Sequence, residues 1–200
     1  MDISKIITAS GLHPSRVFNI YLFGSRVYGT TTHDSDWDIV IVANNSVEAI
    51  EIKSGDWNIH IFTPDKFQKD LDWHMPKNLE CHFAPNWAVL KESKKFDFNF
   101  DLNKLRHSAS HVSSNSWVKA KKKLLVAGEY NIGIKSLFHS IRIPMFATQI
   151  ANTGKIEDFS CANSIWDKLK SKDWTWEELD NEFRDLRNKT LTEFRKVAAK

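Results

Sequence analysis

Two aspartates, Asp36 and Asp38, stand two positions apart at the start of the apolar run WDIVIVA (residues 37–43). In a β-strand, side chains two positions apart leave the same face, so both carboxylates would face the same way. Carboxylates this close repel each other, and a hard divalent cation that prefers oxygen ligands would neutralise them while keeping substrate phosphates in its shell. The spacing therefore predicts a Mg²⁺ or Mn²⁺ site at Asp36 and Asp38.

A glycine and a serine precede these aspartates in FGSRVYGT (residues 23–30). Gly24 lets the backbone approach a ligand closely, and the hydroxyl of Ser25 can bond a phosphate oxygen. The exposed N–H groups of a helix that begins here would also attract an anion. We therefore predict that Gly24, Ser25 and the adjoining Arg26 bind a nucleoside triphosphate beside the metal. The alternative is an ordinary turn before an ordinary strand.

The pattern of apolar residues changes near residue 100. Before it, apolar residues alternate, which predicts strands at 17–23, 37–43, 49–54 and 57–62, the last two forming a hairpin. Thr63 and Pro64 are typical of a helix start, so a helix is expected over 64–75. After residue 101 the spacing is helical, with a bend or a boundary expected at Pro144 and a capping box at Thr175 and Glu178. The sequence predicts an α+β domain over residues 1–100 and a helical domain over residues 101–200.

The Gly24-Ser25 pair, ten residues, and then Asp36-x-Asp38 resemble the signature of the DNA-polymerase-beta-like nucleotidyltransferase superfamily. GSRVYGT with SDWD is most similar to small prokaryotic and viral nucleotidyltransferases with a C-terminal helical part. The resemblance implies a small mixed or antiparallel sheet with flanking helices, followed by a C-terminal helical bundle. It also implies two Mg²⁺ or Mn²⁺ ions, with Asp36 and Asp38 as catalytic metal ligands, and attack of an acceptor on the α-phosphorus of a nucleoside triphosphate with loss of pyrophosphate.

The family's third carboxylate would come from the neighbouring strand WNIHIF (residues 57–62). If Trp57, Ile59 and Ile61 pack against helices, Asp56, Asn58 and His60 share the opposite face. Asp56 is the only acid among these three, so it is predicted to be a catalytic residue and the third metal ligand. The alternative is a hairpin-turn aspartate beside Gly55. Counting back from Phe67, the family's acid aligns with Asn58, which departs from the pattern and points to weakened or lost activity.

A basic stripe is predicted in IKSLFHSIR (residues 134–142), where Lys135, His139 and Arg142 fall at i, i+4 and i+7. Arg142 can grip phosphate through two nitrogens, whereas Lys135 acts as a point charge. We predict that these three residues bind the triphosphate or the acceptor. The alternative is a partly buried, hydrogen-bonded histidine with two solvated cations. The stripe, WNIHIFTPDKF and PKNLECHFAP are also similar to a related nucleotidyltransferase group associated with RNA ligases.

Hydropathy and net charge narrow the classes of protein that the sequence fits. No segment approaches the roughly 18 uninterrupted apolar residues of a membrane span, and MDISKIITASG lacks the features of a signal peptide, so we expect a cytoplasmic protein that does not bind a membrane. The expected partners are a nucleoside triphosphate and an acceptor, which is an RNA end (tRNA included), a protein hydroxyl or a small molecule. A non-catalytic nucleotide-binding or antitoxin-like module is the second hypothesis. A nucleic-acid-binding domain that uses the lysines of residues 119–123 is the third, and a net charge of only +3 makes it the weakest.

Overall fold

The computed structural model describes residues 1–33 and 35–199, and the chain divides into two compact units, Met1–Asn99 and Phe100–Lys200. The first unit holds a five-stranded sheet in the order β3-β4-β2-β1-β5, in which only the β2–β4 pair is parallel. The sheet is therefore mixed and carries flanking helices, as the resemblance implied, and the α+β prediction is confirmed. The strands are β1 (Val17–Phe23), β2 (Trp37–Ala43), β3 (Ala49–Ser54), β4 (Trp57–Phe62) and β5 (Val89–Glu92).

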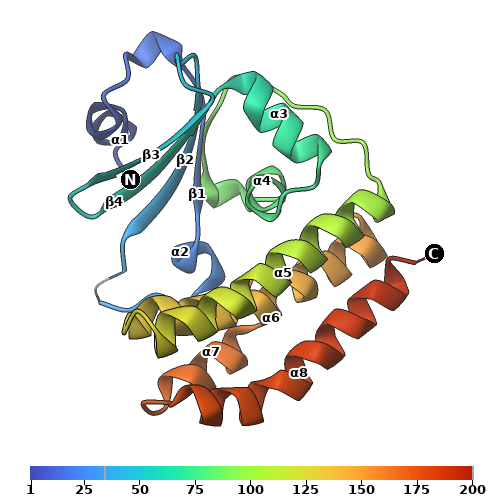
Figure 1. The fold of residues 1–200 in the computed structure, drawn as a ribbon. Helices are drawn as coiled ribbons and strands as arrows, with labels where there is room; N and C mark the ends of the chain where they lie inside the picture. Colours follow the sequence, from blue (N-terminus) through green and yellow to red (C-terminus); the bar gives the residue numbers. More distant parts are fainter. Residues whose placement is uncertain (34, 200) are drawn as a thin grey trace. The chain divides into compact units, whose positions relative to one another are not determined.

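The helices of the first unit cover both faces of this sheet (Figure 1). One face packs against α1, which contacts β3 and β4, and the other packs against α3 and α4. Phe67 of α3 stacks on Tyr21 of β1, with ring centroids 6.0 Å apart. Ile39, Ile41, Ile59 and Ile61 are fully buried, so the centre of the core lies in β2 and β4. These helices are α1 (Ile3–Ser10), η1 (Pro14–Arg16), α2 (Ser25–Tyr28), α3 (Pro64–Asp72), α4 (Pro76–His82) and η2 (Asn86–Ala88).

The helix after Thr63 is shorter than the sequence suggested. The Thr63 hydroxyl caps it by accepting a hydrogen bond from the Lys66 amide, but α3 ends at Asp72 and not at Met75. His74 has a positive φ of 56°, and Met75 precedes Pro76, which disfavours helical geometry at that position. The predicted end of this helix was therefore wrong because the backbone turns to begin α4.

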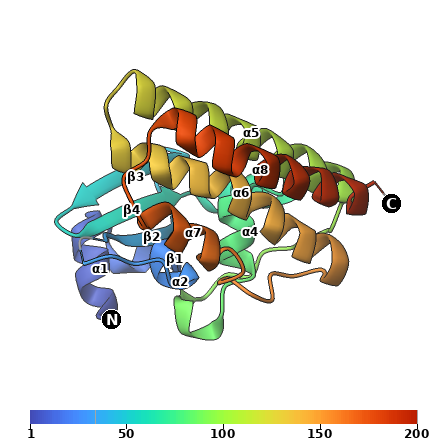
Figure 2. The same ribbon diagram turned by 90° about the horizontal axis from the view of Figure 1, so that it is seen from below.

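The second unit is helical and consists of α5 (Leu102–Leu125), α6 (Tyr130–Thr153), α7 (Asn163–Lys170) and α8 (Trp176–Val197). Helices α5, α6 and α8 run side by side, and each contacts the other two (Figure 2). Leu137, Ile141, Leu179 and Phe183 lie in the core of this unit. Gly133 permits a close approach of α6 to α5, since a Cβ there would lie 2.5 Å from Leu124 Cγ. A C-terminal helical bundle is therefore confirmed.

Pro144 lies inside α6, which begins at Tyr130 and ends at Thr153, so no helix boundary falls at this proline. A proline removes the backbone N–H that would bond the carbonyl four residues earlier. That carbonyl belongs to Ser140, and it accepts a 2.6 Å hydrogen bond from the Ser113 hydroxyl of α5. A neighbouring helix therefore satisfies the group that the proline leaves open. Within residues 1–33 and 35–199, no helix combines the length and the apolar content that crossing a bilayer requires.

Candidate active site

Strand β2 places Asp36 and Asp38 at one end of the sheet. Asp38 pairs with Phe23 of β1 and with Asn58 of β4, while Asp36 lies just before the strand. Asp36 precedes the first residue of the strand, so the expectation that its carboxylate and that of Asp38 leave the same face stays a prediction. Asp36 is 39% exposed at its side chain and forms a 3.1 Å ion pair with Lys53 Nζ. Asp38 lies within β2, which pairs with β1 on one side and with β4 on the other.

Gly24 lies directly against the carboxylate of Asp38. Its φ of 77° and ψ of −155° fall in a region that is open only to glycine. A Cβ at this position would stand 2.3 Å from Asp38 Oδ2, closer than any real contact. The backbone of the Gly24-Ser25 turn therefore touches the same carboxylate that the sequence predicts to hold a metal. The helix α2 then begins at Ser25, whose hydroxyl makes no hydrogen bond with any residue that the structure describes.

Arg26 holds the turn in place through contacts within the protein. Its guanidinium lies 3.7 Å from the centroid of the Trp37 ring and donates a 2.7 Å hydrogen bond to the carbonyl of Ser35. These contacts tie α2 to the loop that leads into β2. A direct contact between Arg26 and a nucleotide stays a prediction.

Asn58 occupies the place beside Asp38 where the family's third acid was expected. Its side-chain amide donates a 3.1 Å hydrogen bond to Asp38 Oδ1. Asp56 lies in the exposed turn between β3 and β4, where its backbone carbonyl accepts a hydrogen bond from the Trp37 amide. Across residues 1–33 and 35–199, no three His, Cys, Asp or Glu side chains gather closely enough to hold a metal ion. The structure therefore brings Gly24, Asp38 and Asn58 together and leaves Asp56 in a hairpin turn.

Two further side chains extend this site. Lys77 Nζ of α4 donates to Nδ1 of His60, 3.0 Å away, and the Nε2 of that ring lies 3.4 Å from the amide nitrogen of Asn58. Burial, and then the charge of Lys77, lowers the pKa of His60 to about 4, while burial lowers the pKa of Lys77. The imidazole is therefore neutral at pH 7. The alternation along β4 already placed His60 on the face of Asn58, but no sequence signal places Lys77 beside the acids.

A second link joins α2 to α4. The hydroxyl of Tyr28 donates a hydrogen bond to the buried carboxylate of Glu80. Tyr28 ends the short helix that begins at Ser25, so Glu80 fixes the far end of the predicted phosphate-binding turn. The segment PKNLE, which was assigned by resemblance alone, therefore supplies both Lys77 and Glu80 to the surroundings of the site.

The predicted basic stripe lies on α6 of the second unit. His139 and Arg142 are together, because Arg142 Nη2 donates to His139 Nδ1 across 3.2 Å. Arg142 is only 3% exposed and its guanidinium lies 4.6 Å from the centroid of the Phe146 ring, whereas Lys135 is exposed. Burial, followed by the charges of Arg142, Lys119 and Lys135, lowers the pKa of His139 to about 3. The ring is neutral and surrounded by cations, and its binding to a triphosphate or acceptor stays a prediction.

Comparison with known proteins supports the family assignment. A search of curated proteins found no match. The model of the nucleotidyltransferase domain family matches residues 3–123, which include the Gly24-Ser25 turn, Asp36 and Asp38. The matched region covers more than half of the chain and contains the whole mixed sheet. The chain therefore belongs to the nucleotidyltransferase domain family, within the DNA-polymerase-beta-like superfamily.

Proposed function

We propose that this protein is a metal-dependent enzyme that transfers a nucleoside monophosphate from a nucleoside triphosphate to an acceptor and releases pyrophosphate. The observation that carries this proposal is the seating of Gly24 against the carboxylate of Asp38. A triphosphate bound along the Gly24-Ser25 backbone would lie within reach of that carboxylate and of Asp36 on the same face. The Ser25 hydroxyl would then donate to a phosphate oxygen.

The side chains present suit a metal held by two carboxylates better than a metal held by three. Two carboxylates on one face fit Mg²⁺ or Mn²⁺, since such ions are often held by one or two carboxylates together with substrate phosphates. Bound there, the metal would neutralise charge that develops on the phosphates during transfer. Asp56 and Asn58 do not complete a set of three carboxylates. We therefore propose that Asp36 and Asp38 hold the metal and that Asp56 does not.

The remaining side chains of the site position these groups. Asn58 orients the carboxylate of Asp38, and Lys77 holds the ring of His60 through its Nδ1. Arg26 fixes the loop before β2. For the acceptor, we retain an RNA end, a protein hydroxyl or a small molecule. We propose that Lys135, His139 and Arg142 contribute to binding of the acceptor or the triphosphate.

One observation favours a second candidate function. The amide of Asn58 stands where the family's third acid was expected, and it already donates to Asp38. A site with one carboxylate fewer would bind metal more weakly and could bind a nucleotide without transferring it. A non-catalytic nucleotide-binding module, or an antitoxin-like module that binds a protein partner, is therefore the alternative.

Label transfer tests the proposal directly. The protein is incubated with each α-labelled nucleoside triphosphate and with Mg²⁺ or Mn²⁺, in the presence of pooled tRNA or cell extract. Wild type and Asp167→Asn, which changes an exposed aspartate of α7, should transfer label equally. Asp36→Asn and Asp38→Asn should each abolish transfer, and Asp56→Asn should keep its rate within about threefold of wild type, a barrier change below 1 kcal/mol.

The other outcomes separate the alternatives. If wild type binds a fluorescent ATP analogue in an Asp38-dependent way but transfers no label from any nucleotide, the non-catalytic function is correct. If transfer persists in Asp36→Asn and Asp38→Asn, the proposed site is wrong. If Asp56→Asn is as inactive as Asp38→Asn, the exposed turn moves into the site and Asp56 is the third ligand.

A further inference from the structure

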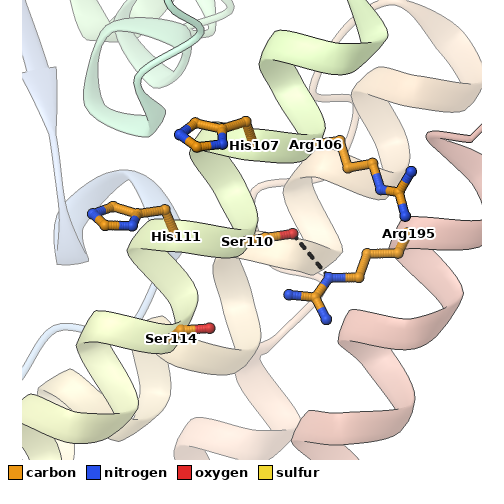
Figure 3. Close-up of a pocket in the computed structure, with 6 residues that line it drawn as sticks. All are labelled: Arg106, His107, Ser110, His111, Ser114 and Arg195. Carbon is orange, nitrogen blue, oxygen red and sulfur yellow. Dashed lines mark hydrogen bonds between the residues drawn. The ribbon is translucent and has the colours of Figure 1, made fainter.

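A basic groove runs over the surface of α5 and reaches α8 in the helical unit, and none of its lining residues is assigned above. Its cavity volume is about 430 Å³, and it is lined by polar side chains only: Arg106, His107, Ser110, His111, Ser114 and Arg195. In Figure 3, Arg106, Ser110 and Arg195 lie on the side of α5 that faces α8, whereas the rings of His107 and His111 project from the opposite side of α5. Two of these lining side chains are arginines, so the groove suits an anionic ligand.

Serine hydroxyls on α5 orient two arginines of α8. Arg195 Nε donates a 3.1 Å hydrogen bond to Ser110 Oγ, and Arg187 Nη2 donates a 3.1 Å hydrogen bond to Ser114 Oγ. The two serines are one helical turn apart, about 6 Å along α5. Arg187 and Arg195 are eight residues, about 12 Å, apart along α8, so two positive charges follow the boundary between α5 and α8. Because a serine hydroxyl carries no charge, these hydrogen bonds leave the positive charge of each guanidinium group uncompensated.

No carboxylate neutralises these arginines. Among the residues that the structure describes, Arg106, Arg187 and Arg195 form no ion pair, whereas Arg184, on the same helix α8, forms one with Asp180. The Nε of Arg187 is buried and has no hydrogen-bond partner within that part of the chain. Burial, and then the charge of Arg195, lowers the pKa of Arg187. The groove thus concentrates positive charge that an anionic ligand would stabilise.

The exposed histidines indicate which kind of anion fits. The rings of His107 and His111 are nearly parallel, with centroids 6.2 Å apart and planes inclined by 6°. Asn115 holds the ring of His111 through a 2.8 Å hydrogen bond. Unstacked bases of single strands commonly stack on aromatic and histidine rings, while basic side chains follow the phosphates. A duplex would not present its bases to these rings.

We propose that the α5–α8 groove is a binding site for single-stranded nucleic acid, with Arg106 and Arg195 on backbone phosphates, Arg187 adding positive charge beside them, and the rings of His107 and His111 against the bases. The site does not depend on nucleotidyl transfer. A chain that transfers no nucleotide would still bind a single strand through this groove.

Fluorescence anisotropy with a labelled single-stranded RNA of about 12 nucleotides tests the site on the full-length protein. Arg106→Gln/Arg195→Gln should weaken binding at least tenfold and reduce the slope of log affinity against log salt by about 1.4, since each phosphate contact on a single strand contributes about 0.7. Lys121→Gln/Lys122→Gln removes the same charge from exposed positions of α5 and should weaken binding less than twofold. Both arginines are exposed, so the thermal midpoint should change by no more than about 2 °C.

Several outcomes would overturn the site. Equal weakening by the arginine and lysine variants would show non-specific attraction to basic helices, and unchanged binding would show that the groove is not used. Preference for a duplex, or for a phosphoserine peptide, would identify a different ligand. Binding of DNA and RNA strands of the same sequence shows whether the groove prefers deoxyribose or ribose. Binding of a fluorescent ATP analogue should be unchanged in Arg106→Gln/Arg195→Gln, so failure of the groove and failure of the proposed transferase site remain distinguishable.

Discussion

Asp38 at the end of the sheet is held by backbone and side chains from two other segments, whereas Arg195 in the helical unit is held by one serine hydroxyl. The carboxylate of Asp38 lies against the Gly24 backbone and accepts a hydrogen bond from Asn58. Arg195 remains exposed and donates to Ser110. The first arrangement fixes a charge in one place. The second leaves a charge available to an extended ligand.

The two regions also differ in how their charges are balanced. Near the aspartates, cations are present in the protein itself, with Lys53 paired to Asp36 and Lys77 bonded to His60. In the α5–α8 groove, the described residues offer the arginines no anionic partner. We infer that the sheet site is preorganised for a defined ligand, while the groove gains affinity mainly from charge and from contacts along a strand.

The largest effect is expected for Gly24→Ala. Its backbone conformation costs about 1–3 kcal/mol for a residue with a side chain, and the new methyl group must also displace the Asp38 carboxylate. We expect a loss of about 3 kcal/mol or more in unfolding free energy and at least a hundredfold loss of transfer, since misplacing a reacting group by about 1 Å has that effect. Urea unfolding and label transfer measure the two losses.

Gly154→Ala is the matched control in the helical unit. Gly154 also has a φ of 77°, but nothing lies within 4 Å of the position of its Cβ. This variant should lose only about 1–2 kcal/mol and should transfer label normally. If the two variants are equally destabilised and equally active, the close contact between Gly24 and Asp38 has no functional role.

The second-largest effect is expected for Asn58→Asp, which places an acid where the family's third carboxylate was expected. Asn58→Asp replaces a hydrogen bond to a charged group with a repulsive contact, so the protein without metal should lose about 2–3 kcal/mol. Mg²⁺ should reverse the loss, because a third carboxylate would complete the ligand set. Thermal unfolding with EDTA and with Mg²⁺ measures this, and Asn181→Asp on the exposed face of α8 should show no dependence on Mg²⁺. A loss that Mg²⁺ does not reverse would mean that no metal binds beside Asp38.

Local sequence patterns predicted much of the first unit. The alternation of apolar residues predicted β1, β2 and the hairpin of β3 and β4 at the bounds that the structure shows, although β1 and β2 are buried on both faces and β3 is largely exposed. The register that pairs Asp38 with Asn58 was not predicted, although Asn58 is the residue that aligned with the family's acid. Strand β5 was missed, since its four residues are defined by pairing with β1, far away in the sequence.

Contacts between distant segments could not be predicted in the same way. Lys77 reaches His60 only because α4 packs on the sheet, and Arg195 reaches Ser110 only because α8 packs on α5. Neither pair has a characteristic spacing along the chain. The capping box at Thr175 and Glu178 predicted the start of α8, but it did not predict which polar residues of α5 would lie opposite the arginines of this helix.

The third effect is a dependence of stability on pH that both units share. The pKa values of His60 and His139 lie at about 4 and about 3 in the folded protein, below the ordinary value of 6.5. The unfolded chain therefore binds more protons between pH 6.5 and these values, so stability falls as the pH is lowered through that window. Each histidine should remove about 2 kcal/mol of unfolding free energy between pH 7.5 and pH 5.

Urea unfolding at the two pH values, on wild type and single variants, assigns this loss. His60→Gln and His139→Gln should each reduce the difference between pH 7.5 and pH 5 by about 2 kcal/mol. His107→Gln, at an exposed position, should leave it unchanged. If only one of the two variants reduces the difference, burial of a neutral imidazole is a feature of that unit alone.

The smallest effect separates helix stability from ligand binding. Thr63 caps α3 in the first unit and Thr175 caps α8 in the second, where Glu178 completes a capping box. Replacing either threonine with alanine should cost about 1 kcal/mol, because an amide at the helix start loses its acceptor. Fraying of α8 is confined to its first turn, and Arg187 lies about three turns further along. Thr175→Ala should therefore melt earlier and yet bind the labelled RNA as wild type does, whereas a parallel loss of RNA affinity would show that the groove depends on the whole length of α8.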